Sequence, residues 1–143
     1  MKHALCSILG VIGAAISAAF GGWSAGMMTL LIFQGIDYLM GLIVAGVFKK
    51  SDKSKSGALE SGAGWKGLLK KGVTWLIVLV AYRLDVVIGS TYVKDAAVIG
   101  FIVNETISII ENAGLMGLPL PAVITKAIEV LKQKSEPEEV KED

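Results

Sequence analysis

Residues 4–36, ALCSILGVIGAAISAAFGGWSAGMMTLLIFQGI, form a run of 33 residues between His3 and Asp37 that contains no charged side chain. A membrane-spanning helix needs about 20 predominantly apolar residues. The run is therefore too long for one straight span and holds most of two. The composition of residues 21–26, GGWSAG, is typical of a turn. We therefore predict two successive transmembrane helices, at about residues 4–20 and 27–48, with Trp23 at a membrane interface.

The rest of the chain is also too apolar for an ordinary soluble domain. Of the 143 residues, 53% are hydrophobic and 19% are charged, whereas globular chains are about 45–50% apolar and about 25% charged. Two further apolar segments lie at about 72–88 and 96–113. The sequence thus predicts an all-α integral membrane protein with about four transmembrane helices in residues 1–118. A three-span arrangement remains an alternative. The net charge of +1 gives no indication of a nucleic-acid partner.

The segment 49–71 carries most of the information on topology. Its Ser- and Gly-rich part, residues 51–64, predicts a mobile loop. Against Asp52 and Glu60 it has seven lysines, at positions 49, 50, 53, 55, 66, 70 and 71. Because cytoplasmic loops are enriched in Lys and Arg, this basic loop is predicted to be cytoplasmic. With four spans both termini then face the cytoplasm, which agrees with Lys2 and with the lysines near the C-terminus.

The predicted transmembrane region ends at about residue 118. Pro119 and Pro121 interrupt it, and residues 119–134 then have apolar side chains at helical spacing with charged side chains opposite. This pattern predicts an amphipathic helix that lies on the membrane surface or packs on another subunit. The charged tail, residues 135–143, is predicted to be disordered.

Small residues recur in the first predicted span and the turn after it. In a bilayer, small side chains allow helix backbones to approach closely, so such a face is typical of helix–helix contact. The face packs either against the chain's own second span or against another copy. The predicted helix-packing residues, with Gly41 added from the second span, are Gly10, Gly13, Ala14, Ser17, Ala18, Gly21, Gly22, Gly26 and Gly41.

Three ionisable residues lie inside predicted spans: Asp37, Arg83 and Glu105. Each costs about 2.5–3.5 kcal/mol at a helix centre on insertion scales. We expect the three at similar depth, with Arg83 paired to one carboxylate and the other carboxylate protonated or hydrated. Asp85, near the outer end of its span, is expected to be a hydrated charge.

Polar stripes accompany these charges and allow a second interpretation, a water-filled lumen. A membrane helix must hide a polar face in protein or turn it toward water, and we expect a single copy to have too little interior for both stripes. The sequence therefore predicts self-association. The predicted polar or pore-lining residues are Gln34, Asp37, Arg83, Asn104, Glu105, Ser108, Glu111 and Asn112.

Sequence signatures of catalysis are absent. The chain contains no HExxH, Gly-x-Ser-x-Gly or phosphate-loop motif, and it has one cysteine, Cys6, and one histidine, His3. We predict no enzymatic activity, no metal, no cofactor and no disulfide within the chain.

Three elements resemble the toxin-secretion and phage-lysis holins. They are residues 37–41 (DYLMG), the basic entry 66–71 (KGLLKK), and residues 104–112 (NETISIIEN) followed by 118–121 (LPLP). The resemblance runs from about residue 30 to residue 133. It implies a holin of the host cytoplasmic membrane that assembles as a homo-oligomer in the lipid bilayer. Such a protein forms lesions that release an endolysin, or in clostridial relatives assist toxin release.

Other interpretations remain open. Asp37 or Glu105 is also compatible with a small ion- or proton-coupled channel or transporter. The amphipathic helix and the lysine loop are compatible with a membrane adaptor. Met27 or Met28 is a possible internal start, and residues 1–20 superficially fit a cleaved signal peptide.

Overall fold

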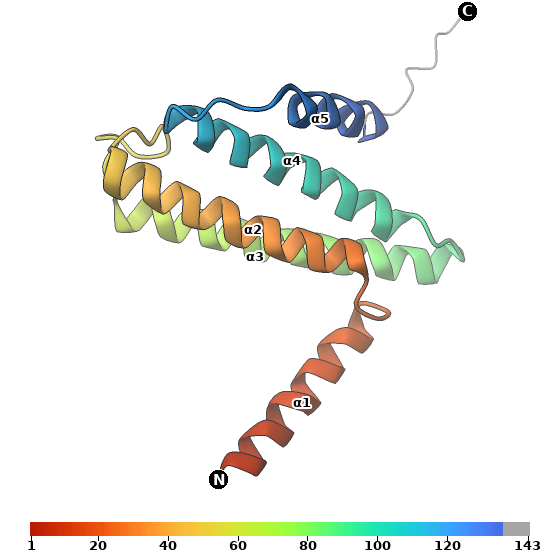
Figure 1. Cartoon of the computed structure of the whole chain (residues 1–143). Helices are drawn as coiled ribbons and strands as arrows, with labels where there is room; N and C mark the ends of the chain where they lie inside the picture. Colours follow the sequence, from red (N-terminus) through yellow and green to blue (C-terminus); the bar gives the residue numbers. More distant parts are fainter. Residues whose placement is uncertain (136–143) are drawn as a thin grey trace, which may run out of the picture.

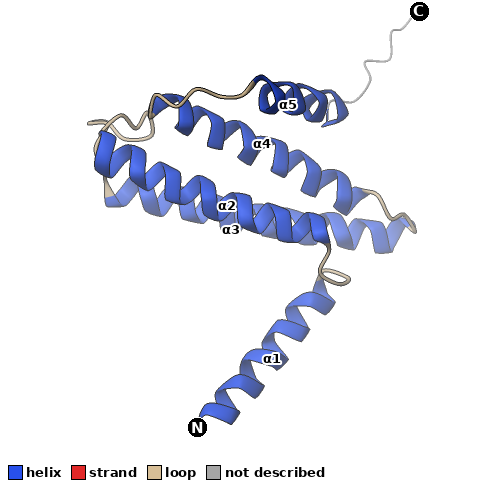
Figure 2. Cartoon of the chain, viewed as in Figure 1, coloured by secondary structure: helices blue, strands red, loops and turns tan. Residues whose placement is uncertain are grey.

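The computed structural model describes residues 1–135, and this part of the chain is all-helical (Figure 2). The elements are α1 (Lys2–Ala19), α2 (Ala25–Ile43), a π-helical turn η1 (Val44–Phe48) that continues α2, α3 (Ser61–Ile88), α4 (Val93–Leu115) and α5 (Ala122–Ser135). The predicted fold class is therefore confirmed. The predicted disordered tail lies, from residue 136 on, outside the described residues.

The predicted turn between the first two helices is confirmed. Gly21 and Gly22 have positive φ angles of 71° and 99°, which glycine adopts without strain. The Ser24 side chain then accepts a hydrogen bond from the backbone N–H of Met27 and caps α2. Among residues 1–135, α1 and the stretch Ala25–Phe48 are the two helices found long and apolar enough to cross a membrane by length and composition.

The start of α3 corrects the sequence prediction. The helix begins at Ser61, not at residue 72, so the loop is only residues 49–60 and Lys66, Lys70 and Lys71 are helical. Leu and Lys are good helix formers, and they outweigh the glycines of residues 61–71. With 28 residues, α3 is about 42 Å long. It exceeds a hydrocarbon layer of about 30 Å by roughly two turns.

Three helices form the bundle. α4 packs against both α2 and α3, and α5 lies beside α4 (Figure 1). α2 and α4 run in the same direction, and α3 runs opposite to both. Near the start of α2, the bundle core is formed by Phe20, Met27, Leu30, Val78 and Val98.

The outer surface of the bundle is apolar. Leu39, Val80 and Val87, for example, are 61%, 54% and 77% exposed. Aliphatic side chains on the outside of helices with a polar interior are the arrangement that a hydrocarbon environment favours. The structure is therefore consistent with a small helical membrane protein.

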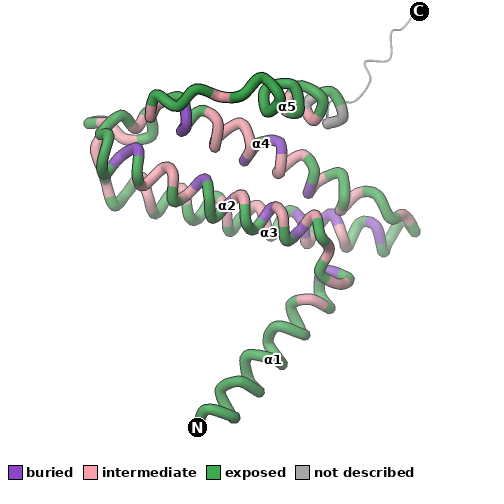
Figure 3. The backbone as a smooth tube through the Cα atoms, viewed as in Figure 1, coloured by how far each residue is buried: buried purple, intermediate pink, exposed green. Residues whose placement is uncertain are grey.

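α1 stands apart from this bundle. It projects away at an angle and none of its residues is buried (Figures 1 and 3). Its end is nevertheless anchored, because the Phe20 ring meets Trp75 edge-on at 6.0 Å and the Lys94 ammonium donates a 3.0 Å hydrogen bond to the Phe20 carbonyl.

Candidate functional site

A buried ion triad joins the three helices of the bundle. It consists of Asp37 of α2, Lys71 of α3 and Glu105 of α4. The Lys71 Nζ donates to the Asp37 Oδ2 at 2.8 Å and to the Glu105 Oε2 at 2.6 Å. Asp37 is 5% exposed and Glu105 is 8% exposed. Two carboxylates therefore share one cation between the helices.

Hydrogen bonds extend the triad along α4 and α2. The Asp37 Oδ1 accepts from the Ser108 hydroxyl at 2.6 Å and from the Asn112 amide at 2.9 Å. On the other side, the Gln34 Oε1 accepts from the Trp75 indole N–H at 2.8 Å. No buried side-chain nitrogen or oxygen of the described residues lacks a hydrogen-bond partner. Such complete satisfaction is what allows polar groups to be enclosed in an apolar environment.

Because the triad is buried, losing one of its charges lowers the stability of the bundle. Removing one partner of a buried ion pair typically costs 3–5 kcal/mol, because the remaining charge has lost its compensation. The triad therefore holds α2, α3 and α4 together only while all three charges stay in place. It stabilises one arrangement of the helices against others.

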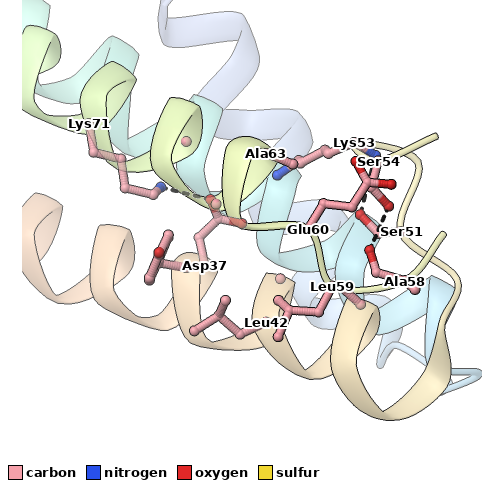
Figure 4. A pocket seen from close by; sticks show the side chains of 15 residues that line it. Asp37, Leu42, Ser51, Lys53, Ser54, Ala58, Leu59, Glu60, Ala63 and Lys71 are labelled. Carbon is pink, nitrogen blue, oxygen red and sulfur yellow. Dashed lines mark hydrogen bonds and ion pairs between the residues drawn. The ribbon is translucent and has the colours of Figure 1, made fainter. Parts of the chain in front are cut away.

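The loop 49–60 folds over the end of the triad. Its Ser54 hydroxyl donates to the Ala58 carbonyl at 2.7 Å. Gly57 has a φ angle of 75° and lies close to Lys49, so that a Cβ added at Gly57 would be 2.6 Å from the Lys49 carbonyl oxygen. The loop encloses a small cavity of about 70 Å³, with Asp37 and Lys71 on its facing helical walls (Figure 4). The segment has local order that its composition alone did not predict.

A larger hollow lies between α3 and α4. It has a volume of about 390 Å³ and is lined by Lys53, Lys66, Lys70, Lys71 and Asn104 among others. Asp37 and Glu105 also line it. The triad is thus reached from outside through a predominantly basic entrance.

The expected role of Arg83 is wrong in this structure. Lys71, not Arg83, pairs with Asp37 and Glu105. Arg83 is exposed and lies twelve residues further along α3, or about 18 Å along the helix axis. It lies near the C-terminal end of α3, away from the triad. Lys71 was missed because it was assigned to the loop, although its spacing to Trp75 and Val78 is helical.

Asp85 is likewise not a hydrated end charge. It is 5% exposed and accepts 2.9 Å hydrogen bonds from the backbone N–H groups of Val93 and Lys94. The Ser90 hydroxyl also donates to it. Asp85 therefore caps the first turn of α4, where a carboxylate satisfies free N–H groups and opposes the helix dipole.

The predicted polar residues divide into two groups. Gln34, Asp37, Glu105, Ser108 and Asn112 come together at the triad, whereas Arg83, Asn104 and Glu111 are exposed. One copy encloses the inward part of both stripes, because Lys71 bridges α2 and α4 from the third side. Asn104 and Glu111 of the α4 stripe stay exposed. Self-association therefore stays a prediction.

The predicted helix-packing residues also divide. Gly10, Gly13, Ala14, Ser17 and Ala18 lie on α1, which does not pack on α2 in this structure. The alternative in which this face covers the chain's own second span is therefore not observed.

The remaining small residues have local roles. A Cβ at Gly21 would lie 2.2 Å from the Tyr82 ring, so glycine is needed there. Gly22 belongs to the same turn. Gly26 lets α2 approach Val98, where an added Cβ would lie at 3.3 Å, and Gly41 borders the small loop cavity.

Comparison with known proteins supports the resemblance seen in the sequence. Residues 14–133 match the bacteriophage holin family. A probable holin of Bacillus phage phi105 is 32% identical over 115 residues, covering 80% of this chain and 79% of its own length.

Uncharacterised bacterial proteins are similar over most of their length. One from Halalkalibacterium halodurans is 38% identical over 85% of this chain and 89% of its own length. One from Clostridium perfringens strain 13 is 36% identical over 92% of this chain and 94% of its own length. No solved structure matches the chain.

Proposed function

The chain belongs to the bacteriophage holin family, and we propose that it acts as a holin: it accumulates in the cytoplasmic membrane of a bacterial host and opens that membrane to release an endolysin. The members of this family are non-enzymatic membrane proteins. The observation that carries the proposal is the ion triad, a satisfied polar network inside a bundle with an apolar outer surface. A network of this kind can be sealed in one arrangement of the helices and hydrated in another.

In the proposed sealed state, each copy hides the polar residues of its own triad. Asp37, Lys71 and Glu105 compensate one another, and the aliphatic outer faces meet lipid. Copies associate through the exposed small-residue face of α1, where close backbone approach gives dispersion contacts. In this way a homo-oligomer forms without an open lumen.

In the proposed open state, α4 moves away from α2 and α3, so that Asp37 and Glu105 face water in a lumen shared by several copies. Hydration then replaces the contacts made by Lys71. Membrane depolarisation biases the change if a triad charge moves across the field, because one charge moved through 100 mV contributes about 2.3 kcal/mol.

For topology we propose four spans, formed by α1, α2 with η1, α3 and α4. The basic loop and both termini are then cytoplasmic. α5 lies along α4 in this structure, and its polar face has Lys126 and Glu129 exposed.

The function is tested by co-expressing the chain with a cytoplasmic muralytic enzyme in a bacterial host. Abrupt loss of culture turbidity after a lag, dependent on both proteins, is the expected result. Asp37→Leu and Glu105→Leu are expected to shift the time of lysis or abolish it, because each removes a group that holds the sealed bundle and lines the open one. Ile36→Leu, at an exposed apolar position next to Asp37, is the matched control and should lyse on the wild-type schedule.

Two outcomes would contradict the proposal. Selective ion flux without escape of the enzyme would indicate a small ion-coupled channel instead. Wild-type timing in both carboxylate variants would show that the triad takes no part in opening.

A further inference from the structure

Three hollows adjoin one another along α3 and α4, and the second and third are shallow. The basic hollow of about 390 Å³ shares Lys70 and Thr74 with a second hollow of about 270 Å³. The second shares Ile77 and Phe101 with a third of about 470 Å³. We refer to the three together as the α3–α4 groove.

One end of the α3–α4 groove carries excess positive charge. Four lysines and two carboxylates line it, which leaves a net charge of +2 (4 − 2). Lys71 pairs with both carboxylates. The other three lysines, Lys53, Lys66 and Lys70, form no ion pair within the described part of the chain, and the Lys53 ammonium donates a 3.5 Å hydrogen bond to the Ser108 hydroxyl. Lys66 and Lys70 are exposed, so the excess charge of this end can attract an anion.

The rest of the α3–α4 groove is mainly apolar. Leu69, Val73 and Ile77 of α3 line the middle hollow with Phe101 of α4, and Lys70 and Thr74 lie where it adjoins the basic hollow. Further along, Ala97 and Gly100 leave room beside Ile77. An added Cβ at Gly100 would meet nothing within 4 Å.

The length and direction of the α3–α4 groove match one leaflet of a bilayer. From Lys66 to Ile77 the groove follows α3 for eleven residues, or about 16 Å. Half of a hydrocarbon layer of about 30 Å is about 15 Å. In the proposed topology the lysines at the start of α3 lie at the cytoplasmic headgroups, and the apolar part then runs toward the midplane.

We propose that the α3–α4 groove binds an anionic phospholipid, with the headgroup phosphate among Lys53, Lys66 and Lys70 and one acyl chain along Ile77, Phe101 and Gly100. Basic pockets between transmembrane helices on the cytoplasmic side are suited to anionic headgroups. The lipid would bridge α3 and α4 beside the triad. The inference rests on the membrane location within the proposed function, and it is independent of pore formation.

Binding to the purified full-length chain in neutral detergent tests the headgroup. Phosphatidylglycerol, phosphatidylcholine and inorganic phosphate are titrated separately, with native mass spectrometry and the thermal midpoint as readouts. Phosphatidylglycerol is expected to bind at least tenfold more tightly than phosphatidylcholine, and inorganic phosphate is expected to leave the thermal midpoint unchanged.

Two charge variants locate the site. Lys66→Gln/Lys70→Gln is expected to weaken phosphatidylglycerol binding about 25-fold, since each lysine near an anionic surface contributes a factor of about five. Lys50→Gln/Lys55→Gln removes the same charge from exposed positions outside the α3–α4 groove and is expected to change binding less than twofold.

A size variant tests the acyl chain. Gly100→Leu fills the apolar part without altering any charge and is expected to weaken phosphatidylglycerol binding at least tenfold. Gly35→Leu, at an exposed open position of α2, is the matched control. Circular dichroism without lipid shows whether each variant is folded. If Gly100→Leu does not fold, the lysine variants still decide whether the site exists.

Several results would overturn the inference. Equal affinity for phosphatidylcholine, equal loss in the two lysine variants, or stabilisation by phosphate alone would each exclude a phospholipid site of this kind. Unchanged binding by folded Gly100→Leu would exclude the acyl-chain path. A chain that binds phosphatidylglycerol but never releases the muralytic enzyme would leave the lipid site standing and refute the proposed function.

Discussion

Replacing Lys71 with methionine is the sharpest test of what holds the bundle together. The substitution keeps the length of the side chain and removes the charge that Asp37 and Glu105 share. Their contacting oxygens lie 2.8 and 2.6 Å from the Lys71 Nζ, so the two carboxylates are at most 5.4 Å apart at these atoms. At an effective dielectric constant of about 20, two like charges at that distance repel by about 3 kcal/mol.

We therefore expect Lys71→Met to lower the free energy of unfolding by about 3–5 kcal/mol, the range found when one partner of a buried ion pair is removed. Unfolding is measured in mixed micelles by tryptophan fluorescence, for which Trp75 is well placed because it donates to Gln34 beside the triad. In cells the same variant is expected to lyse earlier than wild type, since the sealed state is weakened.

Two further variants separate charge from packing. Asp37→Asn/Lys71→Met/Glu105→Gln carries no charge at the triad and is expected to recover most of the lost stability. Lys70→Met removes the neighbouring lysine, which forms no ion pair in the described structure, and is expected to change stability by less than 0.5 kcal/mol. A Lys71→Met protein within 1 kcal/mol of wild type would refute the reasoning, because the carboxylates would then not depend on this cation.

Two other predictions concern the first helix and its turn. Gly21→Ala is expected to lower the free energy of unfolding by about 1–3 kcal/mol, because φ is 71° and the new Cβ would collide with the Tyr82 ring. Gly10→Ala is the control, because nothing lies within 4 Å of a Cβ at that position. Equal effects of the two substitutions on unfolding in mixed micelles would contradict this account. If copies associate through the small-residue face of α1, mild oxidation in membranes should link Cys6, which is exposed and lies one turn before Gly10, to Cys6 of a second copy. Ala14→Leu should reduce this crosslinking several-fold on a denaturing gel and delay lysis, whereas Val11→Leu should do neither, and undiminished crosslinking in Ala14→Leu would argue against that face.

Much of the fold follows from local properties of the chain. A 33-residue run without charge, a Gly-Gly turn and periodic apolar residues were enough to predict the all-helical class and the positions of α1, α2 and α4. The helical spacing of Gln34 and Asp37 also indicated which face of α2 turns inward. On α4 only Ser108 and Asn112 of the predicted stripe turn inward, whereas Asn104 and Glu111 are exposed. These signals depend only on neighbours along one helix.

The partner of the buried carboxylates could not be predicted in this way. Arg83 was a reasonable candidate because it lies inside a predicted span, and Lys71 was excluded because it ended a basic loop. The pairing depends on how far α3 extends and on its register against α2 and α4, and hydropathy carries no information about either. Because α3 begins at Ser61 and not at residue 72, Lys71 is helical and its ammonium can face Asp37.

Residue pattern and hydropathy thus specify which segments are helices and which of their faces are polar, because both follow from the periodicity of a single helix. The assembly of three helices specifies what meets those faces: Lys71 between two carboxylates, Asp85 at the start of α4, and Ser108 and Asn112 against Asp37. The physical reason is that burial and charge compensation are set by distances between helices, and these distances exist only once the helices have packed.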